Sequence, residues 1–385
     1  MKAAVASTDL SDSAAAGKEL AREIMGKLGA QADAIIVFAA PEHDHAALLA
    51  SVSQASASGV VVGASSAGEF TNLVRGGGLA CVLALRGDDV AFTAAVGRGL
   101  TRDPAAAARE IARGFVGPDT PEFEHKAALV LTDALAGYAD ILVDELTLAT
   151  AGQYQFFGGG AGDNARFQRT TVFFRGEVLS DAAVALEILS NKPIGVGVSH
   201  GWEPASRPFR VTEAHGMRLI SLDGLPAVEA FEEHAASTNK RVDRKEPIPF
   251  FLHNILGIDT GVGYRLRVPL AVLDDGAVLC AAEIPVGSVV HIMRTTHDSA
   301  VEAARRAADA AVKSFTTPPA AALFFDCVAT RLRMGEHFEQ ELAGLAERLG
   351  PIPLAGCNTH GQIARAEGQF QGFHNCTAVV CAFPE

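Results

Sequence analysis

A pattern that occurs three times along the chain constrains its fold more than any other feature of the sequence. In each copy an apolar strand is followed by a helix, a second apolar strand, a glycine-rich loop and a further strand. The three loops read GASSAGEF (63–70), GGGAGDN (158–164) and GCNTHGQI (356–363). Repetition of this kind indicates one supersecondary unit used several times, whose copies stack to bury their apolar faces.

Glycines mark the end of the expected helix in every copy. Gly59, Gly152 and Gly350 follow the helical stretches, where a left-handed residue ends a helix at little cost. A further strand and helix precede the second and third copies. The expected first residues of these two helices are Asp103 with Pro104, and Asp298 or Ser299.

These units predict an α/β (α+β) fold with two related halves. Each half is expected to be built from duplicated strand–helix–strand–loop–strand units, with helices covering its sheets. The strands between the halves are short and hairpin-like, so we expect the sheets to be mixed or antiparallel. The sequence VTEAHGMRLISLDG indicates that a new unit starts near Gly216. We therefore expect one domain over 1–215 and a second over 216–385.

Composition narrows the class of protein. The 385 residues carry a formal net charge of −13, and an acidic surface repels phosphate backbones, so no nucleic-acid partner is expected. No apolar run approaches the roughly 20 residues of a membrane span. The N-terminus lacks the apolar region of a signal peptide. We therefore expect a cytoplasmic protein without membrane insertion, whose six cysteines are reduced and mostly buried in strands.

The three loops are candidate ligand-binding elements, and because they stand at corresponding ends of repeated units, we expect them to meet around one shared cleft. A glycine-rich loop after a strand exposes backbone N–H groups that can hold an anion, and short polar side chains add further hydrogen-bonding groups. The candidate ligand-binding residues are Ser65, Ser66, Glu69, Asp163, Asn164, Arg331, Cys357, Asn358, Thr359 and His360. The alternative, which the sequence leaves open, is that these loops are tight turns with close backbone packing.

Arg331 stands outside the loops, in DCVATRLRMGE. Its planar guanidinium suits a ligand carboxylate, but a structural salt bridge with Asp326 or Glu336 explains it equally.

Nucleotide binding and catalysis find little support. The chain lacks GxxxxGK[ST], and GGGAGDN leads into another strand instead of the helix that a dinucleotide fingerprint requires. Cys357 with His360 three residues on could serve as nucleophile and base, but no paired acid and no GxSxG sequence accompany them. A non-catalytic protein is the expectation.

Two histidines are candidates for binding haem or a metal. His200 lies at a strand end beside Trp202, and His360 lies inside the third loop. Haem requires one or two axial ligands and a wide apolar pocket. The chain contains no CxxCH, which excludes covalent attachment, so a haem here would be haem b. A purely structural role is the alternative for both histidines.

Several motifs, taken in order, resemble the FIST family: GASSAGEF, GVGVSHGWEP, FRVTEAHG, ISLDGLPAVEAF, CVATRLRMG and PLAGCNTHGQIA. The resemblance implies an N-terminal FIST domain (1–215) and a C-terminal FIST domain (216–385). It also implies an intracellular sensory function, with a small ligand such as an amino acid and a separate signalling partner such as a histidine kinase. A chain of this size further resembles the haem-binding, nitric-oxide-sensing branch of that family. In the third loop the family often has an aromatic residue and Glu, whereas this chain has His360 and Gln362. This difference is compatible with His360 as a haem contact.

Three hypotheses follow. The first is a haem-dependent gas sensor using His200 or His360. The second is a haem-free sensor of an amino acid or similar metabolite, using the loop polar groups and Arg331. The third is a hydrolase or transferase using Cys357. No kinase, cyclase or DNA-binding segment is visible in the sequence, so we expect the sensor to act through contact with another protein.

Overall fold

The computed structural model describes residues 1–56, 59–72, 74–366 and 371–385. Three repeats of the same order, strand–helix–strand–helix–strand–loop–three strands, form its body. The first contains β1 (Lys2–Thr8), α1 (Ser13–Leu28), β2 (Ala34–Ala39), α2 (His45–Val52), β3 (Val61–Ser65), β4 (Glu69–Thr71), β5 (Arg75–Gly76) and β6 (Ala80–Arg86). The second contains β7 (Val90–Arg98), α3 (Pro104–Arg113), β8 (His125–Thr132), α4 (Ala139–Ala149), β9 (Gln155–Gly160), β10 (Val172–Phe174), β11 (Glu177–Leu179) and β12 (Ala182–Ser190).

The third repeat is interrupted after its first strand. It contains β13 (Gly195–Ser199), α7 (His297–Val312), β23 (Ala321–Cys327), α8 (Val328–Met334), α9 (Phe338–Leu349), β24 (Leu354–Thr359), β25 (Gln362–Arg365), β26 (Gln371–His374) and β27 (Ala378–Phe383). The predicted three copies and the mixed α/β class are thus confirmed. The first copy is longer than expected, since it also begins with a strand and a helix, β1 and α1.

The three repeats form three six-stranded mixed sheets of the same topology. Their orders are β1-β6-β2-β3-β10-β11, β7-β12-β8-β9-β25-β26 and β13-β27-β23-β24-β4-β5. In each sheet the strands on either side of the helix pair in parallel, as β2 does with β3, and their neighbours are antiparallel. The strands read as continuous apolar runs because both faces of the sheets are covered.

Each repeat gives the strand after its glycine-rich loop to the sheet of another repeat. β4 of the first repeat pairs with β24 of the third, β10 of the second with β3 of the first, and β25 of the third with β9 of the second. The exchange is cyclic, so the three loops must cross between the sheets at one place.

The inner faces of the three sheets share one hydrophobic core. Phe38, Phe157 and Phe325, one from each sheet, meet there, with ring centroids 5.6 Å apart for Phe38 and Phe325 and 6.5 Å apart for Phe157 and Phe325. The outer faces bury separate cores under helix pairs, α1 with α2, α3 with α4, and α7 with α9. In α4 and α9 the buried residues recur mostly at intervals of three or four positions, which places them on one face of the helix.

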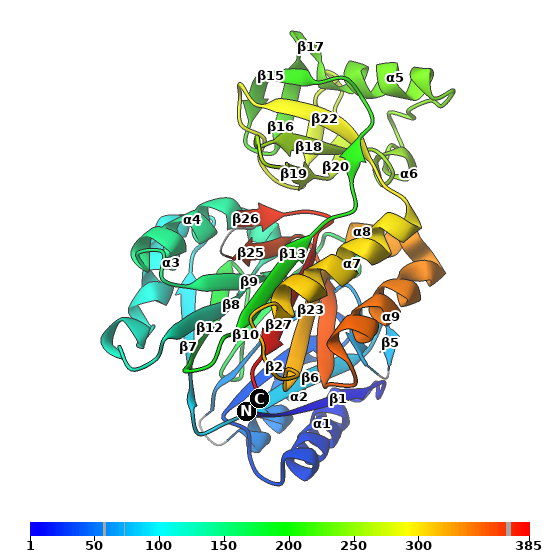
Figure 1. Ribbon diagram of the computed structural model, residues 1–385. Coiled ribbons are helices and arrows are strands. Elements are labelled where there is room, and N and C mark those ends of the chain that lie inside the picture. Colours follow the sequence, from blue (N-terminus) through cyan, green and yellow to red (C-terminus); the bar gives the residue numbers. More distant parts are fainter. Residues whose placement is uncertain (57–58, 73, 367–370) are drawn as a thin grey trace.

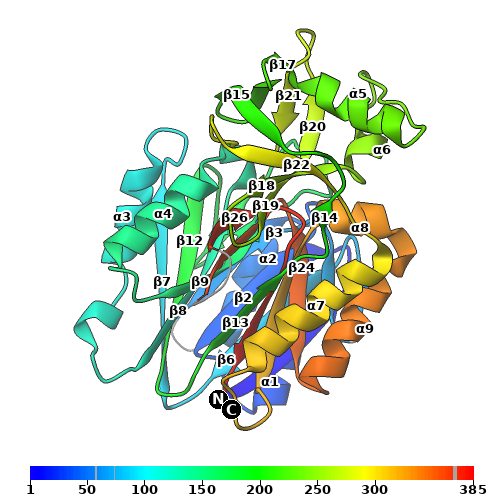
Figure 2. The same cartoon turned by 45° about the horizontal axis from the view of Figure 1, so that its top comes forward.

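An antiparallel nine-stranded lobe is inserted between β13 and α7, and Figures 1 and 2 show it standing apart from the helix-covered body. It contains β14 (Glu203–Pro204), β15 (Phe209–His215), β16 (Arg218–Leu222), β17 (Leu225–Pro226), α5 (Ala227–Ser237), α6 (Ile248–Phe251), β18 (Ile255–Asp259), β19 (Tyr264–Arg267), β20 (Pro269–Val272), β21 (Val278–Cys280) and β22 (Val289–Arg294). Gly216 lies in the turn between β15 and β16. The division into domains at that residue stays a prediction.

Most predicted helix signals are confirmed. Gly152 and Gly350 have φ of 70° and 76°, and Asp103 caps α3 with Pro104 in its first turn. Gly59 also has a positive φ, although α2 ends earlier, at Val52. The expected start of α7 was wrong by a few residues. Its cap is Thr296, whose hydroxyl accepts from the backbone N–H of Ser299 in a capping box. Among the described helices, none is long and apolar enough to cross a membrane.

Candidate functional site

The three glycine-rich loops meet where the sheets exchange strands. The first and third loops are joined by the N–H of Ala67 donating to Asn358 O (2.9 Å) and the N–H of Asn358 donating to Gly68 O (2.8 Å). Gly162 of the second loop donates to Ser65 O of the first at 2.8 Å. His360 of the third loop donates its backbone N–H to Gly160 O of the second at 3.0 Å. The sequence prediction that the loops converge therefore agrees with the structure.

This close approach explains the glycines. A Cβ added to Gly162 would lie 2.6 Å from the nitrogen of Ala67. Gly68 has a φ of 137°, and a Cβ there would lie 2.2 Å from Nη1 of Arg331. Because the loop amides named above donate to carbonyls of neighbouring loops, they are not free to hold an anion. Any ligand must instead use hollows beside the loops.

Five of the predicted site residues are buried within the loop network. The Ser65 hydroxyl accepts from the N–H of Thr171 (3.0 Å), and the Ser66 hydroxyl donates to Glu69. Asp163 accepts from the N–H groups of Phe167, Gln168 and Arg169. The Thr359 hydroxyl donates to Asp326 O at 3.2 Å. Burial alone would raise the pKa of Asp163, but the three backbone N–H groups lower it. Of these five, Glu69 lines one of the two hollows described below, and the other four line neither.

Four predicted residues line one hollow of about 640 Å³, which we call the Arg331 hollow. It lies between the first loop, β4, β5 and α8. The predicted residues on its wall are Glu69, Asn164, Arg331 and Asn358. Other wall residues include Arg75, Gly76, Gly77, Glu336 and Phe338. The Arg331 guanidinium donates to Ala67 O of the first loop. No ion pair within 4.0 Å joins Arg331 to Asp326 or Glu336 among the described residues, so the expected structural salt bridge is not formed there.

The polar groups on this wall have features of a ligand site. Within the described part of the chain, Asn358 Nδ2 and Asn164 Oδ1 are buried and have no hydrogen-bond partner. Such groups are uncommon in folded proteins because each costs free energy. Burial raises the pKa of Glu69 to about 7, although the Ser66 hydroxyl, the N–H of Leu79 and the charge of Arg331 oppose the rise. The hollow therefore offers cations, an unpaired donor, an unpaired acceptor and a carboxyl group that titrates near neutral pH.

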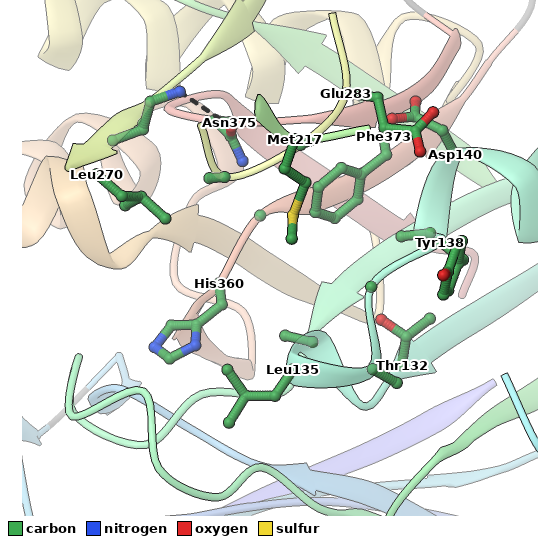
Figure 3. A pocket seen from close by; sticks show the side chains of 18 of the residues that line it. Thr132, Leu135, Tyr138, Asp140, Met217, Leu270, Glu283, His360, Phe373 and Asn375 are labelled. Atoms are coloured by element: carbon green, nitrogen blue, oxygen red, sulfur yellow. Dashed lines mark hydrogen bonds between the residues drawn. The ribbon is translucent and has the colours of Figure 1, made fainter. Parts of the chain in front are cut away.

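A second hollow of about 330 Å³, which we call the interlobe hollow, lies between the body and the lobe. Figure 3 shows His360 and Leu135 of the body on one side and Met217 and Leu270 of the lobe on the other. Beside it Arg267 of β19, which is 1% exposed, donates to Asp140 Oδ2 (2.9 Å) of α4 and to Phe373 O (3.0 Å) of β26. These bonds fix the lobe to the body at the rim of the hollow.

His360 lines the interlobe hollow. Its ring stacks on Phe167, with centroids 4.8 Å apart, and its Nε2 lies 3.6 Å from Asp163 Oδ1. Among the described residues, neither ring nitrogen has a hydrogen-bond partner. Burial lowers the pKa of His360 to about 4, although the charge of Asp163 opposes this, so the ring is neutral at pH 7. A neutral imidazole is the form that binds a metal.

His200 does not fit the predicted haem site. Its Nε2 lies 3.2 Å from Tyr264 O, and its Nδ1 accepts from the N–H of Trp202 at 3.3 Å. The hollow beside it holds only about 10 Å³, which is about the space of one water molecule. An iron ligand at this position would require both bonds to break and the hollow to open.

Cys357 lies in the central core of the three sheets and is 1% exposed. Burial, with Cys81 and Glu69 nearby, raises the pKa of its thiol well above the usual range. A nucleophilic cysteine needs the opposite shift. The geometry therefore favours a structural role for Cys357.

Several site residues were missed by the sequence analysis. Arg75 lines the Arg331 hollow, and Arg267 with Asp140 joins the lobe to the body. No local motif marks these residues, because their partners are distant in sequence. Cys327 and Cys376, whose side chains hydrogen-bond each other, were read only as buried hydrophobic residues.

Comparison with known families agrees with this architecture. The FIST N domain model matches residues 33–225, and the FIST C domain model matches residues 227–365. The chain therefore belongs to the FIST family, whose domains are signal-transduction sensor domains that bind small ligands.

The similar curated proteins are themselves uncharacterized. One from Mycobacterium tuberculosis is 25% identical over 264 residues, which covers 67% of this chain and 68% of that protein. One from Methanocaldococcus jannaschii is 26% identical over 172 residues, covering 42% of this chain and 32% of that protein. One from Mycobacterium bovis is 24% identical over 244 residues, covering 58% and 59%.

Proposed function

We propose that this FIST protein is a haem-free sensor that binds an amino acid or a similar metabolite in the Arg331 hollow and reports it to a separate signalling protein such as a histidine kinase. One observation carries the proposal. Groups that suit a carboxylate (Arg331, Arg75 and Asn358 Nδ2) and groups that suit an ammonium (Glu69 and Asn164 Oδ1) face the same hollow.

The charge pattern matches a zwitterion. Arginine forms bidentate hydrogen bonds with a carboxylate, and the unpaired Asn358 amide can add a further donor. An ammonium group can donate to Asn164 Oδ1 and to Glu69 once that carboxyl is ionised. A ligand that hydrogen-bonds to both Asn358 Nδ2 and Asn164 Oδ1 removes the free-energy cost of leaving these atoms unpaired. Each of the two hydrogen bonds therefore adds to the affinity.

The position of the hollow supplies a route to a response. Its wall includes the first loop from the first repeat, Asn164 from the second, and α8 with Asn358 from the third. A ligand in contact with all three repeats favours the conformation in which they are closest. The ligand can change the affinity for a partner protein only to the extent that it binds this conformation more tightly than the alternative one.

A charge exchange at the two asparagines tests the ligand site. Asn358→Asp places a carboxylate against the ligand carboxylate and should weaken binding about 10- to 100-fold, the equivalent of about 1.5–3 kcal/mol. Asn164→Asp, the matched control of the same size and charge, should leave binding unchanged or tighten it. Calorimetric titration with each of the common amino acids, after a thermal-shift screen, measures both. Equal effects of the two variants, or no binding of any amino acid by the wild type, would refute the proposed site.

The signalling arm is tested separately. The autophosphorylation rate of a histidine kinase from the same organism is measured with the protein alone and with protein and ligand together. We expect the ligand to change the rate only when the wild-type protein is present. The Asn358→Asp variant should give no ligand response at a concentration that saturates the wild type.

The unpaired nitrogens of His360 favour haem b in the interlobe hollow as a second candidate. His360 would hold the haem through a ring nitrogen, and Asp163 would orient the imidazole as carboxylates commonly do behind metal-binding histidines. When bound, haem would supply an iron that takes nitric oxide. Reconstitution should then give a Soret band that His360→Ala abolishes and His200→Ala retains. A wild-type protein without that band would remove this candidate.

A further inference from the structure

Two cysteines from distant parts of the chain meet beside the interlobe hollow. Cys327 ends β23 and directly precedes α8, whereas Cys376 lies in the turn between β26 and β27. Their side chains hydrogen-bond each other and belong to one hydrophobic cluster with Trp202 and Met293. Cys376 also has a φ of 49°, a left-handed conformation that costs a non-glycine residue free energy and often marks a functional position.

The pair is reachable from the hollow. Cys327 forms part of the wall of the interlobe hollow together with Val328, Ala329 and Asn375, although the residue is 3% exposed. Cys376 lies behind it, facing the smaller hollow near Asp326 and Arg333. The interlobe hollow therefore borders Cys327, whereas Cys376 is not part of its wall.

Cys327 is chemically distinct from the other cysteines. The hydrogen bond from Cys376, together with the N–H of Ala329 and the Gln362 amide, lowers the pKa of the Cys327 thiol to about 6 despite its burial. Burial raises the pKa of the thiols of Cys81, Cys280, Cys357 and Cys381. Since the thiolate is the nucleophile, reactivity should concentrate at Cys327.

We propose that Cys327 and Cys376 form an oxidant-reactive pair, in which a small peroxide entering the interlobe hollow oxidises Cys327 and Cys376 then closes a disulfide. In the first step the Cys327 sulfur attacks one peroxide oxygen, the O–O bond breaks, and the leaving oxygen takes a proton to become water or an alcohol. Cys327 is then a sulfenic acid. In the second step the Cys376 sulfur attacks the Cys327 sulfur, the S–O bond breaks and water leaves. Two thiols are oxidised by two electrons, and one peroxide is reduced.

The disulfide would act on the neighbouring ligand site through α8. That helix starts at Val328, which lines both hollows, and it carries Arg331. Fixing Cys327 to the β26–β27 turn restrains the start of this helix. Oxidation should therefore change the affinity for a ligand in the Arg331 hollow. This effect on affinity rests on the proposed function, whereas the formation of the disulfide is independent of it.

Mass spectrometry tests the chemistry. The reduced wild-type protein is treated with one equivalent of hydrogen peroxide, digested without reductant, and analysed for a Cys327–Cys376 cross-linked peptide, which a small thiol should remove. In Cys376→Ser, dimedone should label Cys327 as the trapped sulfenic acid, at least about ten times faster than any other cysteine, since its thiolate fraction at pH 7 is far larger. Cys280→Ser, a buried cysteine of the lobe, is the matched control and should still form the cross-link.

Three outcomes would overturn the proposal. They are the absence of the cross-linked peptide in the folded wild type, dimedone label spread equally over the cysteines, or a cross-link that forms only in denaturant. Circular dichroism of each variant shows whether it is folded, and the wild-type result stands without any variant. An unchanged affinity for the amino acid after complete oxidation would refute only the coupling through α8.

Discussion

Replacing Glu69 by glutamine should stabilise the protein above pH 7 and change its stability little at pH 4.5. The Glu69 carboxyl is 1% exposed, and burial raises its pKa from an ordinary value of 4.5 to about 7. The folded protein therefore keeps this proton between pH 4.5 and 7, whereas the unfolded chain releases it. Linkage then requires the contribution of Glu69 to stability to fall as pH rises through this window and to level off above about pH 7.

The magnitude follows from the separation between the two pKa values. Each unit of difference between the folded and unfolded pKa values is worth about 1.4 kcal/mol. The ionised Glu69 therefore lowers the free energy of unfolding by about 3 kcal/mol above pH 7. Glutamine keeps an oxygen that can accept from the Ser66 hydroxyl and the N–H of Leu79 but never ionises. The variant should thus exceed the wild type in free energy of unfolding by about 3 kcal/mol at pH 8, with little difference at pH 4.5.

Urea unfolding at pH 4.5, 6 and 8 measures the effect. Far-UV circular dichroism and the fluorescence of Trp202, the single tryptophan, are recorded together, because the lobe and the body can unfold separately. Glu347→Gln, on the exposed face of α9, serves as the control and should give a pH-independent difference near zero. A difference for Glu69→Gln that is the same at all three pH values would refute the reasoning.

Two further substitutions test the packing around the sites. Gly68→Ala should destabilise the protein by about 2–4 kcal/mol in urea unfolding, because it combines a positive φ with a steric clash. Gly26→Ala, in a helix with open space around it, should stabilise by up to about 1 kcal/mol, and equal effects of the two would contradict the close-approach argument. Arg267→Ala should cost about 3–5 kcal/mol, since Asp140 loses its buried partner, and should speed proteolysis between lobe and body. Arg294→Ala, at an exposed ion pair, should cost under about 1 kcal/mol; a similar loss there would argue against Arg267 as the anchor.

Local features of the sequence predicted the repeated unit well. The apolar strands, the stops at Gly152 and Gly350, and the cap at Asp103 depend on neighbours within a few residues, so they can be read from the chain directly. The convergence of the loops also followed, because equivalent ends of repeated units tend to meet.

Features that depend on distant partners were not accessible from the sequence. Nothing near Glu69 indicates that β4 pairs with β24, about 285 residues later, since strand pairing is decided by the whole sheet. The lobe separates β13 from the rest of its repeat and conceals that copy's true start. Ser65 and Asp163 looked like ligand groups, but the same short polar side chains serve equally well to bond a loop to its own backbone.

The cyclic exchange, in which each repeat gives two strands to the sheet of another repeat, has a consequence for assembly. Three separate single-repeat chains would reproduce the same ring as a domain-swapped trimer, with each subunit completing its neighbour. Joining such chains end to end would need only short connections, like the few residues that link β6 to β7 and β12 to β13. In the present chain the three units of such a ring are joined covalently, and the third unit alone carries an inserted lobe, so the parts of the ring cannot separate on dilution as those of a trimer can.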